Sequence, residues 1–295
     1  MPRAARITAA TPTSVRAPTV VHPHLDEHVQ PIVKWAGGKT RLLPELVSRM
    51  PSKREWTGRY FEPFMGGAAL FMHLLPRNAQ LTDMNAELVN LYEVVRDDVE
   101  SLVDDLRHHA HEREYYYAVR ALDAARLGRI ERASRFIFLN RTCFNGLYRV
   151  NRRGQFNVPF GRYDNPNLCP EDRLRAVSRA LADTAIAVAD FEDAVADAKR
   201  GDFVYFDPPY VPLTRTANFT SYTAGDFGEG DQRRLADVVR RLGKRGVRCM
   251  LSNSDTPFTR ELYAGLRIEA VMAPRAISRA AETRRPVSEL LVRTY

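Results

Sequence analysis

The chain has 295 residues, of which 44% are hydrophobic and 27% are charged, and its formal net charge at pH 7 is +8. This composition is that of a globular protein long enough to bury one large core or two. No apolar run approaches the roughly 18 residues that span a bilayer, and the first thirty residues hold no apolar stretch of signal-peptide length, so we expect neither membrane insertion nor export. Three scattered cysteines without a CxxC pair indicate neither a disulfide framework nor a zinc site, and they favour a reducing cytoplasm.

Residues 1–30 are rich in Ala, Thr, Pro and Arg without periodicity, which predicts a disordered tail. In the following PIVKWAGGKT, the paired glycines predict a sharp turn before a helix over residues 42–50. The Gly-Gly-Lys-Thr run is similar to the end of a phosphate-binding loop, but the glycine expected four residues upstream is missing. Binding of a nucleoside triphosphate is therefore disfavoured.

A second glycine pair lies in RYFEPFMGGAALF, where a short strand at residues 60–61 leads into a helix over residues 68–75. Such glycines let the backbone approach a ligand, but the third glycine of a dinucleotide fingerprint is absent. We therefore expect a nucleoside without a pyrophosphate. In the next motif, LTDMN, Asp83 ends a second strand, where it either accepts from ribose hydroxyls or caps a helix over residues 86–95.

The middle of the chain changes character. Helical patterns over residues 99–125 and 130–139 precede an Asn-Gly pair, which predicts a hairpin, and a second turn followed by an extended strand. Between Arg126 and Arg162 there are nine arginines and one acid, a local excess equal to the net charge of the whole chain. Such a field predicts a nucleic-acid-binding element, and the alternative is a solvated surface with an anionic protein partner.

The rest of the chain alternates strands and helices. We expect strands at 185–191, 203–206 and 247–254, helices at 194–199 and 231–243, and a final β pair at 268–274 and 287–294. This order predicts an α/β fold: a three-layer, doubly wound, mostly parallel sheet. The basic segment is then an insertion between the second and third strands.

The apolar strand at 203–206 ends at two prolines, which cannot donate to a sheet ladder. Asp207, Pro208, Pro209 and Tyr210 thus present a carboxylate, a rigid turn and an aromatic ring at the strand's carboxyl end, where ligands bind in open α/β sheets. The alternative is an ordinary proline turn with a solvated carboxylate.

The motifs KWAGGK, FEPFMGG, LTDMN, ADF and DPPY occur in this order, with the Arg-rich hairpin before ADF. This set resembles the Dam-like, D12 class of DNA adenine-N6 methyltransferases over roughly residues 31–295. The resemblance implies a Rossmann-like methyltransferase fold. It also implies an enzyme of a bacterial or phage cytoplasm that methylates adenine N6 in double-stranded DNA. The cofactor would be S-adenosylmethionine (SAM), the product S-adenosyl-L-homocysteine, and no metal is needed because the sulfonium methyl is already electrophilic.

The resemblance assigns residues 31–95 with 180–295 to a SAM-binding catalytic domain and residues 96–179 to a mainly helical DNA target-recognition domain. The cofactor would be bound by Trp35, Lys39, Phe61, Glu62, Phe64, Gly66, Gly67, Asp83, Asp190, Phe191 and Asp207. The catalytic residues would be Asp207, Pro208, Pro209 and Tyr210. The Asp207 carboxylate and the Pro208 carbonyl would accept the two N–H bonds of a flipped adenine, and Tyr210 would stack on its ring.

The same resemblance implies GATC as the recognition site. The DNA-binding residues would be Arg141, Phe144, Asn145, Leu147, Arg149, Arg152, Pro159 and Arg162. Phe144 stands where the family has Tyr, and Arg141-Thr142-Cys143 stands where it has Arg-Tyr-Gly.

Three other functions compete with this interpretation. A cytosine-N4 methyltransferase would use the same acceptor geometry, and a non-catalytic SAM-responsive DNA-binding protein would keep the same pocket. A nicotinamide-dependent oxidoreductase is disfavoured by the incomplete glycine fingerprint. No obligate protein partner is implied, because a monomer acting twice could serve both halves of a palindrome.

Overall fold

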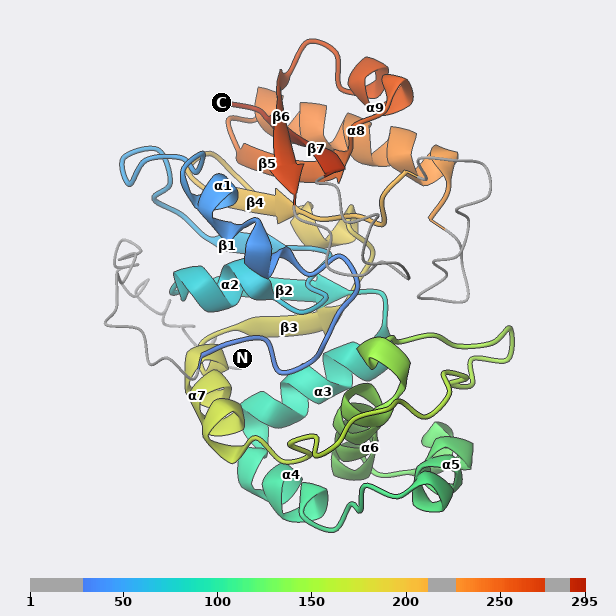
Figure 1. The fold of residues 1–295 in the computed structure, drawn as a ribbon. Coiled ribbons are helices and arrows are strands. Elements are labelled where there is room, and N and C mark those ends of the chain that lie inside the picture. The colour runs from blue at the N-terminus through green and yellow to red at the C-terminus, as the bar shows by residue number, and fades with distance from the viewer. Residues whose placement is uncertain (1–28, 212–226, 274–286) are drawn as a thin grey trace, which may run out of the picture.

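One mixed sheet organises residues 29–211, 227–273 and 287–295, which are the residues that the computed structural model describes (Figure 1). Its strands lie in the order β3-β2-β1-β4-β5-β7-β6. They are β1 (Tyr60–Glu62), β2 (Ala79–Asp83), β3 (Ala185–Val188), β4 (Phe203–Phe206), β5 (Arg248–Ser254), β6 (Arg267–Ala273) and β7 (Val287–Arg293). Strands β1 to β5 are parallel, whereas β7 is antiparallel to β5 and β6. The predicted α/β class with a mostly parallel sheet is therefore confirmed.

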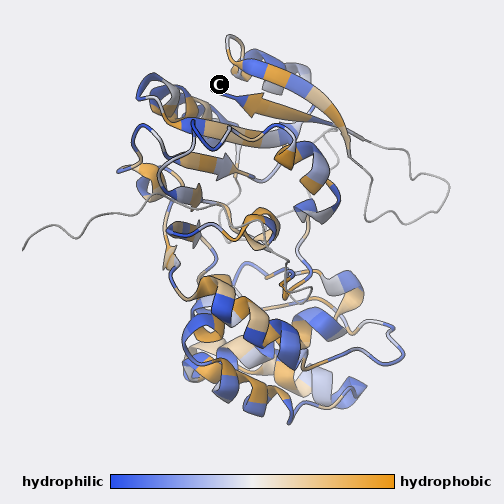
Figure 2. Cartoon of the chain, turned by 90° about the vertical axis from the view of Figure 1, so that its left-hand side faces the viewer, coloured by the Kyte–Doolittle hydropathy of each residue, from blue (hydrophilic) through white to orange (hydrophobic). Residues whose placement is uncertain are grey.

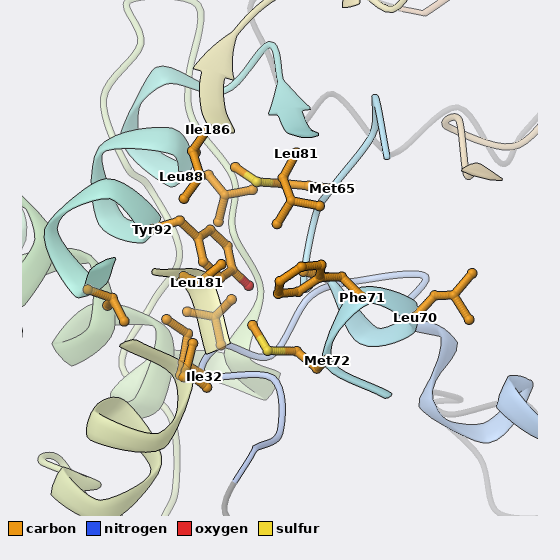
Figure 3. Packing of buried hydrophobic residues seen from close by; sticks show 14 of the residues in the cluster. Ile32, Met65, Leu70, Phe71, Met72, Leu81, Leu88, Tyr92, Leu181 and Ile186 are labelled. Carbon is orange, nitrogen blue, oxygen red and sulfur yellow. The ribbon is translucent and has the colours of Figure 1, made fainter. Parts of the chain in front are cut away.

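Helices pack on both faces of this sheet, and others lie beyond its β3 edge. The helices of the described residues are α1 (Leu43–Val47), α2 (Ala69–Leu74), α3 (Ala86–Asp97), α4 (Val99–Leu106), α5 (Arg113–Ala121), α6 (Arg129–Thr142), α7 (Glu171–Leu181), α8 (Glu229–Lys244) and α9 (Pro257–Leu262). Alternate residues of β4 serve the two faces: Phe203 and Tyr205 pack with α2 and α3, and Val204 and Phe206 pack with α8. On the first face, Phe71 of α2 and Tyr92 of α3 point toward each other (Figure 3).

The strand order reverses direction at β1. Strands β2 and β3 extend the sheet on one side of β1, and β4 and β5 extend it on the other. Such a reversal opens a crevice at the carboxyl ends of the two central strands, which is where ligands bind in this kind of fold. Strand β1 ends at Glu62 and β4 ends one residue before Asp207, so both acids lie at this crevice.

The segment between β2 and β3 forms the helical insertion that was expected. Figure 1 shows α3 to α7 gathered beyond the β3 edge of the sheet, and Figure 2 shows hydrophilic and hydrophobic residues alternating along these helices. Leu102 of α4, Ile137 of α6 and Leu174 of α7 belong to the same core cluster as α2 and α3. A smaller cluster joins α5 and α6 to the hairpin through Tyr116, Phe138 and similar residues. The insertion is therefore anchored to the sheet through a shared core.

Three local expectations were wrong. The helix predicted over residues 99–125 is divided, because the polar segment Arg107–Glu112 has no apolar stripe to bury and α4 ends before it. The expected helix at 194–199 is a short 3-10 turn, Asp193–Val195. Asn145 and Gly146 do adopt the left-handed conformation of a tight turn, but the hairpin itself closes later, at Asn151–Gly154, where Val150 pairs with Phe156.

The predicted tail lies outside the described residues up to position 28, as does residue 274 of the expected strand at 268–274. The final β pair itself is confirmed as the antiparallel strands β6 and β7. Among the helices that the structure describes, none has the length and apolar character required to cross a bilayer.

Candidate active site

A cavity of about 720 Å³ opens at the carboxyl ends of β1, β2 and β4. This size suits a nucleoside or a similar small ligand. Of the residues predicted to bind the cofactor or the substrate base, those that line the cavity are Trp35, Lys39, Glu62, Phe64, Gly66, Gly67, Asp83, Asp190, Phe191, Asp207, Pro208, Pro209 and Tyr210. Phe61 differs, since its ring is buried in the core under α8 with the Arg59 guanidinium 4.5 Å from its centre.

The DPPY loop carries the acid expected to act on the substrate. Lys39 Nζ lies 2.7 Å from Asp207 Oδ1 and 4.7 Å from the centre of the Tyr210 ring. Both charged side chains are largely shielded from solvent. Burial raises the pKa of Asp207 to about 6, and the nearby Lys39 ammonium opposes that rise. At neutral pH Asp207 is therefore an ionised acceptor held by one cation.

Glu62, at the end of β1, is a second acid in the cavity. It is 3% exposed, and its Oε2 accepts a hydrogen bond of 2.7 Å from the Tyr60 hydroxyl. Burial raises the pKa of Glu62 to about 8, although the Tyr60 hydrogen bond and Lys39 favour the ionised form. With this pKa the carboxyl is mostly protonated at pH 7, and a cation placed beside it would favour the ionised form.

Asp83 connects the end of β2 to the loop of the second glycine pair, Gly66 and Gly67. Its two carboxylate oxygens accept from the Gly66 amide at 3.1 Å and from the Asn85 amide at 2.9 Å. Gly66 has a φ of +44°, and a Cβ there would lie 2.7 Å from Trp35 Cδ1, so the loop requires glycine. Burial raises the pKa of Asp83 to about 6, and these amide hydrogen bonds lower it. Asp83 therefore acts as a structural acceptor that also faces the cavity. The Asx turn of the alternative is present, since Asp83 Oδ1 accepts from the amide two residues further on, but the N-cap of α3 is Asn85.

An aromatic cluster forms one end of the cavity. The Phe64 and Phe191 rings are stacked with centroids 5.5 Å apart, and the Phe227 ring meets both edge-on. Asp190 accepts two hydrogen bonds, of 3.0 and 2.8 Å, from Arg234, whose guanidinium lies 4.3 Å from the centre of Phe191. Apolar faces beside a carboxylate suit an adenine ring and its amino group.

Several cavity residues have no sequence motif to reveal them. Phe227, Arg234 and Glu289 line the cavity, and Glu289 Oε2 accepts a 2.7 Å hydrogen bond from the Tyr210 hydroxyl. Glu289 reaches Tyr210 because β7 pairs with β5 and places Glu289 opposite Ser254. The antiparallel placement of β7 beside β5 brings this acid to the site, and no local sequence pattern predicts that placement.

Another part of the cavity wall contacts the segment after α6. Trp35 stacks on Tyr148 with ring centroids 5.6 Å apart. The buried Asn140 side chain bonds to Lys34 N and to Lys34 O, both at 2.8 Å, and donates to Gly146 O at 2.9 Å. Gly146 has a φ of +64°, and a Cβ there would lie 2.4 Å from Lys34 Cδ. The Asn140 hydrogen bonds therefore join the cavity wall to the tight turn.

The predicted DNA-binding residues have different environments. Phe144, Asn145, Arg149, Arg152, Pro159 and Arg162 are exposed, and Leu147 is half-buried. Phe144 N donates to Pro159 O at 2.8 Å, which brings the two predicted contacts together. Arg141 instead donates to the carbonyls of Ile32 and Asn167, both at 3.1 Å, and burial lowers its pKa to about 10.

The arginines between Arg126 and Arg162 likewise include both protein-bonded and exposed side chains. Arg132 is paired with Glu87, and Arg135 donates to the backbone carbonyls of Val119 and Arg120 at 2.9 and 2.8 Å. These side chains bind the insertion together. On the hairpin, by contrast, Arg149, Arg152, Arg153 and Arg162 remain exposed to solvent.

The chain is similar to known DNA methyltransferases over most of its length. The family model described as D12 class N6 adenine-specific DNA methyltransferase matches residues 35–277. The type II methyltransferase M1.LlaDCHI of Lactococcus lactis subsp. cremoris is 42% identical over 91% of this chain and 96% of its own length. The type II methyltransferase M.MjaIII of Methanocaldococcus jannaschii is 42% identical over 90% and 99%, and a DNA adenine methylase of Haemophilus influenzae is 37% identical over 89% and 92%.

Proposed function

The chain belongs to the D12 class of N6 adenine-specific DNA methyltransferases, and we propose that it methylates the adenine of GATC in double-stranded DNA after flipping that base out of the helix. SAM supplies an electrophilic methyl group on its sulfonium sulfur. One observation carries the proposal: the Asp207–Tyr210 loop borders a nucleoside-sized cavity and turns an ionised acid toward it.

The cavity's donors and acceptors fit SAM. Glu62 is an acid shielded from solvent, which suits the ammonium of the methionine portion, and Asp83 offers carboxylate oxygens to ribose hydroxyls. Asp190 and the Phe64–Phe191 stack suit the adenine of the cofactor. Lys39 lies against the DPPY loop, and Trp35 supplies an apolar face to the cavity. The volume of about 720 Å³ lies in the range of small-molecule and cofactor sites.

Asp207 and Pro208 perform the activation in this proposal. An exocyclic adenine nitrogen is a weak nucleophile because its lone pair is delocalised into the ring. Asp207 Oδ1 faces Lys39, so we assign Oδ2 to accept one N–H of the amino group and the Pro208 carbonyl to accept the other. These acceptors favour a pyramidal nitrogen with a free lone pair, and the two prolines hold them in place in advance. Tyr210 stacks on the flipped ring. Taking the base out of the duplex costs about a few kcal/mol.

Residues 96–179 form the target-recognition region of the proposal. We assign base reading to Arg149 and Arg162, which are exposed, because an arginine fork on guanine O6 and N7 is the commonest specific contact. Asn145 and Arg152 would bind phosphates, and Phe144, which is 47% exposed, would wedge beside the flipped base. Arg141 holds the recognition segment against residues 32 and 167 rather than reading a base.

Transfer of a labelled methyl group from SAM to duplex DNA, followed by nucleoside analysis, tests the function. We expect N6-methyladenine as the product. N4-methylcytosine would favour the cytosine-specific alternative, and no methylated base after prolonged incubation would favour a non-catalytic SAM-responsive DNA-binding protein.

A further inference from the structure

Two buried amide side chains hold the backbone of the DPPY loop. Gln232, in the first turn of α8, donates from Nε2 to the Pro209 carbonyl at 2.8 Å. Its Oε1 accepts from Asn253 Nδ2 at 2.9 Å, and Asn253 Oδ1 accepts from the Val211 amide at 3.2 Å. Gln232 is 2% exposed and Asn253 is fully buried. A chain of hydrogen bonds therefore runs from β5 through α8 to the loop.

We propose that Gln232 is a positioning residue that sets the direction of the acceptor groups in the DPPY loop. This inference rests on the proposed methyl transfer. Proline fixes φ at position 209, so anchoring the Pro209 carbonyl restricts the preceding peptide unit, which carries the Pro208 carbonyl. Val211, bonded to Asn253, fixes the far end of the same loop. Gln232 thus orients the acceptors without touching the substrate.

The chemistry of this position requires an amide. The Pro209 carbonyl can only accept and the Asn253 amide nitrogen can only donate, so the residue between them must present one donor and one acceptor. An apolar side chain would leave both partners unpaired in a buried place. An ionised glutamate would place a negatively charged oxygen against the Pro209 carbonyl oxygen, and the two would repel each other. A protonated glutamate would restore the donor.

The position of Gln232 in the helix argues against a role in core packing alone. Helix α8 is anchored to the sheet by its apolar stripe, which includes Leu235, Val239 and Leu242. Gln232 lies one turn before that stripe. Its amide donates to the Pro209 carbonyl of the loop and accepts from Asn253. Burying an amide here is costly unless each polar atom is paired, and the loop supplies a pairing partner.

The test compares Gln232→Met with Gln80→Met, a matched control. Gln80 also donates from Nε2 to a backbone carbonyl, that of Ala194 at 2.9 Å, but it does so away from the DPPY loop. We expect Gln232→Met to lower single-turnover methyl transfer about 10- to 100-fold, corresponding to an acceptor misplaced in the transition state. SAM affinity, measured by calorimetry, should change by less than about threefold, because the amide does not face the cofactor. Gln80→Met should transfer at the wild-type rate.

Gln232→Glu supplies a pH readout that loss of stability alone would not produce. Its rate divided by the wild-type rate at the same pH should rise as the pH falls, because the protonated carboxyl again donates to the Pro209 carbonyl. Equal rates in Gln232→Met and Gln80→Met, or a Gln232→Glu ratio that is flat with pH, would overturn the inference while the wild type stays active. A wild type that methylates no adenine would overturn the proposed function and, with it, this inference.

Discussion

The ammonium of Lys39 lies 2.7 Å from the carboxylate of Asp207, and this ion pair joins the first glycine loop to the DPPY loop. Its partners come from sequence positions 168 residues apart. Lys39 is 6% exposed and its Nζ also donates to the Gly37 carbonyl at 2.5 Å, so the ammonium is held from both sides. The Lys39 ammonium therefore favours the ionised form of Asp207, against the burial that raises its pKa.

The first prediction concerns the pH dependence of methyl transfer. Because the pKa of Asp207 is about 6, kcat/KM for DNA should fall as the pH drops through about 6 and the acceptor becomes protonated. Lys39→Met should move this acidic limb to higher pH, because the ammonium favours the ionised carboxylate. Lys53→Met, at an exposed position, is the control. An unchanged limb in Lys39→Met would show that the pair does not set the protonation of Asp207.

The second prediction concerns stability. Unfolding returns Glu62 from a pKa of about 8 to its ordinary value of 4.5, so the unfolded chain binds fewer protons between these values. The free energy of unfolding therefore contains a contribution that is complete below pH 4.5 and is lost as the pH rises through 8. Glu62→Gln removes this contribution, so its Tm relative to the wild type should increase between pH 6 and 8.5, in contrast to the exposed control Glu112→Gln. A constant difference in Tm would contradict the assignment.

The acids at the cavity were predictable because each ends a strand in a local motif. Parallel strands bring their carboxyl ends to one edge, so Glu62, Asp83 and Asp207 could be expected to converge without knowledge of the packing. Gln232 and Glu289 could not, because their roles depend on how α8 and β7 pack beside β5. Arg132 and Arg135 were counted in a DNA-binding field, although tertiary contacts direct both to protein acceptors.

A third prediction uses tryptophan fluorescence. Trp35 lines the cavity, whereas Trp56 is buried under β1 and β4 and donates to the Arg59 carbonyl. SAM should change the emission of Trp56→Phe, which keeps Trp35, and should leave that of Trp35→Phe nearly unchanged. A response that persists in Trp35→Phe would place the ligand elsewhere.

The fourth prediction separates base reading from phosphate binding on the hairpin. Arg149 is exposed, and its Nε donates to Asn157 Oδ1 at 2.7 Å. Arg149→Ala should reduce discrimination at one base pair by about 1–3 kcal/mol. Arg152→Ala should weaken DNA binding equally across sequences. It should also reduce the slope of log K against log salt concentration by about one. Competition binding with single-base-pair variants of GATC at several salt concentrations checks both effects. A uniform loss in Arg149→Ala would remove it from the base-reading set.

The catalytic role of Asp207 gives the fifth prediction. Asp207→Ala removes the proposed acceptor but no group of the hairpin, so methyl transfer should fall below detection while duplex binding stays within about threefold of the wild type. The exposed Asp183→Ala, in the turn after α7, should behave as the wild type in both assays.

The most direct measurement is a map of modified bases in the DNA of an otherwise unmethylated cell that expresses either the wild type or Asp207→Ala. We predict N6-methyladenine on both strands of GATC with the wild type and none with Asp207→Ala. Methylated cytosine, or adenine methylation that persists in Asp207→Ala, would contradict the assignment of adenine activation to the DPPY loop.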